Sequence, residues 1–242
     1  MTRRPRLERA VRLLPSWLWD KVPRDHRESD EAFQRRRRVT AVTAVTGAGL
    51  LGISLSRRPD SPEFYGLTLA VAGTWLAGGL ASGPLHLGFQ RSGDQRLRRP
   101  LVVPVLTGAG AFGAFYAAAL VARRVPPLDR AISSVLRYAT EGATPLVLTT
   151  TLANGLAEEV FFRGALYAAV GVQRPVLTST AVYGLATTAT RNPALVLASL
   201  VMGTLFGLQR RASGGIQAPM LTHLTWSALM LRFLPPLFAP RP

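Results

Sequence analysis

The chain has 242 residues, of which 48% are hydrophobic and 17% are charged, and its formal net charge at pH 7 is +16. This composition is too apolar for an ordinary soluble domain and indicates a protein that crosses a membrane several times. The absence of cysteine excludes disulfides, thiolate metal sites and a cysteine nucleophile.

The first 38 residues form a polar, basic arm that ends in four consecutive arginines, Arg35 to Arg38. A second basic segment lies at residues 91–99, and an excess of arginine marks the cytoplasmic side of a membrane protein. We therefore predict a cytoplasmic N-terminal arm, residues 1–38, and a transmembrane domain, residues 39–242. A chain rich in Arg, Ala and Gly with Lys21 as its single lysine favours a bacterial source, and hence a multi-pass protein of the plasma membrane.

The basic clusters gather at the ends of apolar runs, where arginines contact lipid headgroups and anionic lipid. We therefore expect membrane lipids as partners, and no nucleic acid. Seven apolar segments follow the arm, and most are long enough to cross a bilayer as helices. They cover residues 39–56, 64–89 with a break near Gly83 and Pro84, 101–122, 143–170, 175–190, 193–209 and 216–238. Residues 128–140 fit either a connecting amphipathic helix or a partial eighth span. The predicted fold class is all-α, a polytopic transmembrane bundle of about seven or eight helices.

Three charged residues interrupt the apolar segment 143–170, namely Glu158, Glu159 and Arg163. Charges at membrane depth are costly and usually mark functional positions. On an α-helix Glu159 and Arg163 share a face, while Glu158 points about 100° away. We expect Glu159 to pair with Arg163, which leaves Glu158 without a partner, free to take a proton from a water or to bind a cation. Asn154, one turn earlier, is placed to orient Glu158. A buried ion network with a purely structural role is the alternative.

His223 is the other ionisable residue singled out inside a predicted span, and Ser227 follows one turn later on the same face. A single histidine on an apolar helix is most often a hydrogen-bonded packing residue. Here a buried carboxylate elsewhere in the bundle needs a polar partner, which favours a role at the same site. The HExxH and GxSxG motifs of soluble hydrolases are absent from the sequence.

These residues resemble the core of the CAAX-processing and bacteriocin-processing family of intramembrane proteases, called CPBP or Abi. The resemblance covers about residues 145–231. It rests on the glutamate pair with its arginine and on the run GTLFGLQRRASGGIQAPMLTH, which ends at His223. It implies a helical membrane bundle that encloses a polar chamber, in which a glutamate activates a water for peptide hydrolysis.

Carried over by position, the resemblance implies that Glu158 is the general base and that Glu159 and Arg163 support the site. It implies that His223 stabilises the oxyanion or, in a metal-dependent member of the family, lies beside the metal.

Two positions depart from the family pattern. Thr187 stands where a histidine is expected, four residues after the aromatic Tyr183, and Ser227 stands where an asparagine is usual. The resemblance brings in a divalent metal such as zinc as a cofactor. Threonine is a poor metal ligand and cannot act as an imidazole base, so Thr187 argues against zinc here. The sequence thus establishes no cofactor and no metal ligand.

Two functions stay open at this point. The first is an intramembrane endopeptidase that cleaves a membrane-associated or C-terminal peptide segment, with a peptide or membrane protein as its substrate. The second is a catalytically inactive relative that binds or stabilises membrane partners, which Thr187 favours. A transporter ranks third, because the charged segment shows no convincing internal repeat.

Overall fold

The computed structural model describes residues 28–91, 96–171 and 173–238. The described residues form a helical bundle with one short pair of antiparallel strands, which confirms the predicted all-α fold class. Most of the predicted arm, residues 1–27, lies outside the described residues. The first described helix begins at Asp30, nine residues before the predicted span, so the end of the predicted arm is helical.

The helix boundaries follow the predicted apolar segments closely. The helices are α3 (Asp30–Ser54), α4 (Pro62–Ala81), α5 (Val102–Ala122), α6 (Pro126–Thr140), α7 (Thr144–Glu158), the π-helix η1 (Glu159–Leu166), α8 (Tyr167–Val170), α9 (Pro175–Thr187), the 3₁₀ turn η2 (Thr188–Thr190), α10 (Pro193–Ser213), α11 (Gln217–Phe233) and the 3₁₀ turn η3 (Pro235–Leu237). Strands β1 (Gln90–Arg91) and β2 (Leu97–Arg98) pair antiparallel.

The helix ends are set by local sequence signals. Ser29 caps α3 and Ser61 caps α4, and each hydroxyl accepts a backbone N–H at 3.2 Å. Asn192 caps α10 just before a proline at the first helical position, where a missing N–H costs nothing. Gly214 ends α10 with φ at 72°, the left-handed conformation that glycine adopts without steric penalty.

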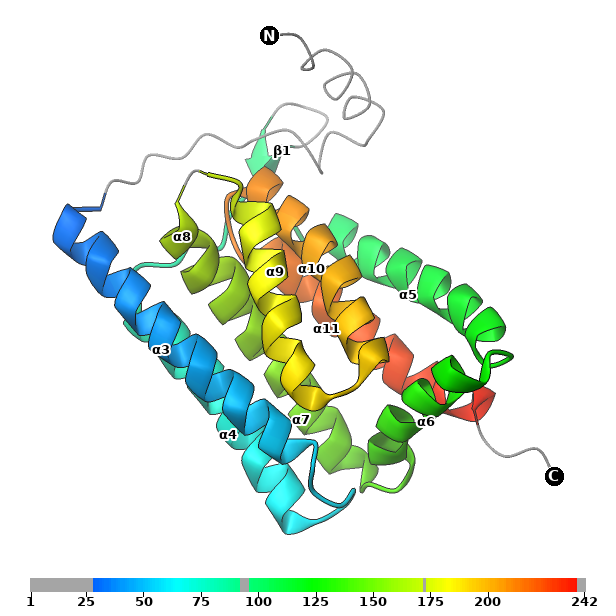
Figure 1. The fold of residues 1–242 in the computed structure, drawn as a ribbon. Helices are drawn as coiled ribbons and strands as arrows, with labels where there is room; N and C mark the ends of the chain where they lie inside the picture. The colour runs from blue at the N-terminus through cyan, green and yellow to red at the C-terminus, as the bar shows by residue number, and fades with distance from the viewer. Residues whose placement is uncertain (1–27, 92–95, 172, 239–242) are drawn as a thin grey trace, which may run out of the picture.

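The segment formed by α7 and η1 lies in the middle of the bundle. It packs against α4 on one side and α11 on another, and η1 also contacts α3, α9 and α10 (Figure 1). A cluster of large apolar side chains fills this centre. The Trp75 ring of α4 lies 4.7 Å from Phe161 and 5.0 Å from Phe162. The charged residues of η1 are therefore held between several helices.

Helices α4, α5 and α10 are long and apolar enough to cross a membrane. The remaining predicted spans stay predictions, because α9 and α11 have 13 and 17 residues and α3 carries charges near its start. Of the two options for residues 128–140, the connecting helix fits better, since α6 has 15 residues and lies at one end of the bundle (Figure 1).

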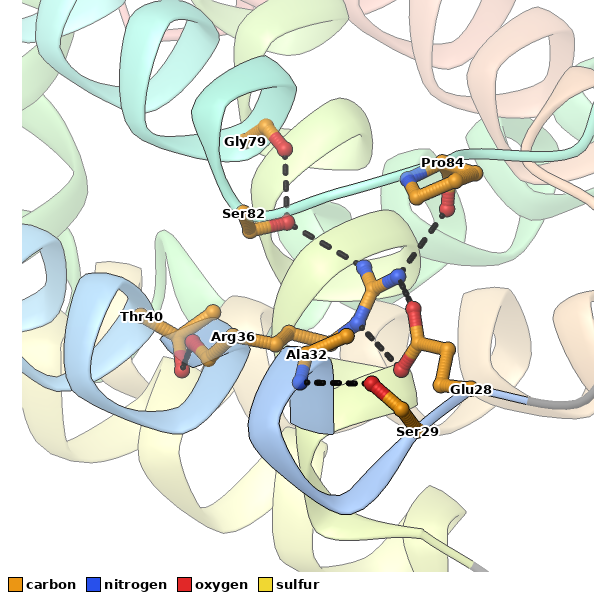
Figure 2. Close-up of polar contacts among 8 residues, drawn as sticks. All are labelled: Glu28, Ser29, Ala32, Arg36, Thr40, Gly79, Ser82 and Pro84. Atoms are coloured by element: carbon orange, nitrogen blue, oxygen red, sulfur yellow. Dashed lines mark hydrogen bonds and ion pairs between the residues drawn. The ribbon is translucent and has the colours of Figure 1, made fainter. Parts of the chain in front are cut away.

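The predicted break after α4 is present and is held by a buried arginine of α3. Gly83 has φ at 137°, and from there the chain leaves the helix. Figure 2 shows the Arg36 guanidinium pointing at the Ser82 hydroxyl, the Pro84 carbonyl and the Glu28 carboxylate. Arg36 thus connects α3 to the end of α4 through the hydrogen bonds of its buried side chain.

Candidate active site

The paired glutamates lie at the junction between α7 and the π-helix η1. We predicted a regular helix through this region, but η1 has π-helical geometry over eight residues, all of them buried. Periodicity could not reveal this change, because a segment covered on every side has no exposed face to mark its period. Short π-helical segments occur often at functional sites.

Glu159 is fully buried and binds two partners. Its Oε1 accepts a hydrogen bond from Arg163 Nη1 at 3.0 Å and lies 2.8 Å from His223 Nδ1. The predicted pair of Glu159 and Arg163 is therefore present. His223 joins it from α11, so three of the predicted site residues form one buried network. A buried carboxylate with a counter-charge and a further hydrogen bond is the arrangement that offsets its lost hydration.

Aromatic rings enclose this network. The Arg163 guanidinium carbon lies 4.6 Å from the Tyr183 ring centre and 4.9 Å from that of Phe206. The Phe206 ring also stacks on the His223 ring at 4.8 Å. Cation–π contacts of a desolvated arginine add to its ion pair.

Glu158 differs from its neighbour in both exposure and partner. Its residue is partly exposed, whereas Glu159 has no exposed surface. Our prediction that Glu158 has no partner was wrong, because the Tyr183 hydroxyl of α9 donates a hydrogen bond of 2.5 Å to Glu158 Oε2. Asn154 does not orient Glu158 either. Its amide donates to the carbonyls of Thr68 and Thr150, which ties α7 to α4.

The two positions that depart from the family pattern are buried. The Thr187 hydroxyl donates to the carbonyl of Tyr183 in its own helix at 2.8 Å. Ser227 lies on α11 one turn after His223. Sequence reasoning did not include Tyr183 among the site residues. A signal was available, because a tyrosine hydroxyl within an apolar segment needs a hydrogen-bond partner.

The residues present do not fit a metal centre. A zinc site needs at least three good protein ligands. Among the described residues no three His, Cys, Asp or Glu side chains lie together in a way that could hold an ion. Two of the atoms that could serve are also engaged, since Glu159 Oε1 binds Arg163 and His223 Nδ1.

A comparison with known protein families finds a match in the part of the chain that holds this site. Residues 140–229 match the family model of the type II CAAX prenyl endopeptidase Rce1-like proteins. These residues are therefore similar to the core of the CAAX-protease family. The core coincides closely with the predicted 145–231 and holds all the predicted site residues. Neither the curated proteins nor the solved structures contain a significant match to the chain.

Of the three described helices of membrane-spanning length, α10 lies within the matched residues, and α4 and α5 lie before them. Together, the match and these helices support a membrane protein with a segment similar to the CAAX-type intramembrane proteases.

Proposed function

We propose that the protein is an intramembrane endopeptidase that cleaves a membrane-associated or C-terminal peptide segment with a water activated by Glu158. The observation that carries this proposal is the difference between the two glutamates. Glu159 is sealed from solvent and its Oε1 binds both Arg163 and His223, while Glu158 is partly exposed beside them. Only a carboxylate that water can reach is able to act as the general base.

The reaction balances without a metal. Glu158 accepts one proton from the water as the water oxygen bonds to the carbonyl carbon of the substrate, which gives a tetrahedral oxyanion. The carbon–nitrogen bond then breaks, and the proton held on Glu158 passes to the leaving amine. Glu158 returns to its ionised form, and the water is divided between the new carboxyl and amino groups.

His223 is the group we assign to the developing oxyanion. Its Nδ1 faces Glu159, and a Cβ added to Gly155 would lie 3.6 Å from its Nε2, so the small residue on α7 leaves room at that edge of the ring. In its protonated form the ring donates from Nδ1 to Glu159 and from Nε2 to the substrate oxygen. Ser227, one turn on, is the second candidate donor.

Glu158→Gln tests this function, because it keeps the side-chain shape and removes the base. We expect the purified protein in detergent to cleave members of a fluorogenic membrane-peptide library, and the variant to be slower by about 10²- to 10⁴-fold. Glu141→Gln, an exposed glutamate outside the site, is the matched control and should cleave normally. Cleavage that survives unchanged in Glu158→Gln would remove Glu158 from the mechanism.

A second function is favoured by Thr187, whose hydroxyl is used by its own helix and which brings no imidazole to the site. On this alternative the protein is a non-catalytic relative that binds or stabilises membrane partners. It predicts no cleavage of any peptide by the wild type, and partner capture that Glu158→Gln leaves unchanged.

The proposed partners are membrane lipids and the peptide or membrane-protein substrate. The proposed location is the plasma membrane of a bacterium, with the N-terminus in the cytoplasm. The arginines of the arm and of residues 91–99 support this orientation.

A further inference from the structure

Tyr183 is the residue outside the predicted site whose contacts point most directly to the chemistry. Its hydroxyl donates to Glu158 Oε2 at 2.5 Å, and no other hydrogen-bond partner of the Glu158 side chain is recorded within the described residues. The phenol belongs to α9 and the carboxylate to the end of α7, so the contact joins two helices.

The Tyr183 ring is itself held in place from three sides. The Arg163 guanidinium carbon lies 4.6 Å from its centre, and the Phe162 ring centre also lies 4.6 Å away. On α10, a Cβ added to Gly203 would lie 3.2 Å from Tyr183 Cδ1. Gly203 therefore gives the ring the space that a larger residue would take, and the hydroxyl has a defined direction.

Thr187 does not compete for this role. Its hydroxyl donates to the backbone carbonyl of Tyr183, one turn away on the same helix. The group that α9 offers to Glu158 is thus the phenol of Tyr183, although position 187 is where the sequence pattern places the polar side chain.

We propose that Tyr183 is the positioning residue of the reaction, and that its hydroxyl fixes the Glu158 carboxyl so that Oε1 faces the water. This rests on the proposed function. A short hydrogen bond to one carboxyl oxygen restricts rotation of the group and leaves the other oxygen to accept the proton. A general base that is displaced from its productive geometry loses rate even when its chemistry is intact. Tyr183 itself takes no proton in this scheme.

Tyr183→Phe tests the role, because it removes only the hydroxyl and keeps the ring beside Arg163 and Phe162. We expect kcat to fall by about 10- to 100-fold while KM changes little, since the substrate does not bind through this hydroxyl. Tyr138→Phe is the matched control. That tyrosine donates to the carbonyls of Leu55 and Arg57 at the end of the bundle, so its loss should leave kcat unchanged.

Infrared spectroscopy gives a readout that needs no substrate. The antisymmetric carboxylate band of Glu158, identified as the band missing in Glu158→Gln, should shift in Tyr183→Phe and stay in place in Tyr138→Phe. An unmoved band would overturn the inference, and so would a moved band with kcat unchanged. If Tyr183→Phe does not fold, the C–O band of ring-labelled tyrosine, compared between wild type and Glu158→Leu, tests the same contact.

The two proposals fail in different ways. Full cleavage by Glu158→Gln, or no cleavage by the wild type, overturns the proposed function and with it the positioning role. Full cleavage by Tyr183→Phe combined with a slow Glu158→Gln variant overturns the positioning role and leaves the peptidase intact.

Discussion

The adjacent residues Glu158 and Glu159 lie in opposite environments, because successive residues of a helix point about 100° apart. Glu159 points into the bundle, where Arg163 and His223 compensate its charge. Glu158 points toward α9 and keeps some exposed surface. The two side chains have the same chemistry, so only their difference in exposure makes Glu158 a candidate base and Glu159 a structural carboxylate.

Arg163→Met is predicted to destabilise the protein strongly, because it leaves Glu159 buried without its counter-charge. Removing one partner of a buried pair costs about 3–5 kcal/mol, whereas Glu158→Gln should be nearly neutral. Thermal unfolding in detergent measures both.

The control for Arg163→Met is a pair of the same spacing on the surface. Arg137 and Glu141 lie four residues apart on α6 and the loop after it, with 61% and 46% of their side chains exposed. Arg137→Met should leave the melting temperature unchanged, because exposed pairs contribute little. A normal melting temperature for Arg163→Met would contradict a buried pair at Glu159.

The segment after α4 and the turn before α11 are docked through their backbones. Phe89 N–H donates to the Ser213 carbonyl at 2.8 Å, and Ile216 N–H donates to the His86 carbonyl at 2.9 Å. Gly215 makes this approach feasible, because an added Cβ would lie 2.0 Å from the Leu87 carbonyl carbon. The docking sets where α11 begins, and α11 carries His223.

Gly215→Ala is predicted to destabilise the protein by about 1–3 kcal/mol, because the methyl group would meet backbone that cannot rotate away. Gly110→Ala on α5 is the control, since a Cβ there has no atom within 4 Å. Alanine in a helix is favoured over glycine by up to about 1 kcal/mol, so this control should be neutral or slightly stabilising. Equal melting temperatures for the two variants would show that the two segments are not docked as described.

At the scale of the whole molecule, the distribution of arginines is expected to set the orientation of the protein in the membrane. Arginines of the arm and of residues 91–99 favour one side, while Arg57, Arg58 and Arg123 lie near the other ends of their helices and weaken the bias. The two ends of α3 report the orientation, since Glu31 and Ser56 are both exposed.

The chain has no cysteine, so single cysteines can be introduced without a background. With the N-terminus in the cytoplasm, Ser56→Cys should react with a membrane-impermeant maleimide in intact cells, and Glu31→Cys should react only after lysis. The reverse pattern would place the N-terminus outside, and labelling of both in intact cells would contradict a crossing by α3.

The sequence by itself determined the all-α class, nearly every helix boundary and the pair of Glu159 with Arg163. Apolar length, capping residues and spacing along one helix are local properties, and they persist whatever the neighbours are. The tertiary structure alone decided that His223 binds Glu159, that Tyr183 binds Glu158 and that η1 is a π-helix. Each of these depends on which helices pack against α7 and η1, and the packing of separate helices brings together residues that no local pattern connects.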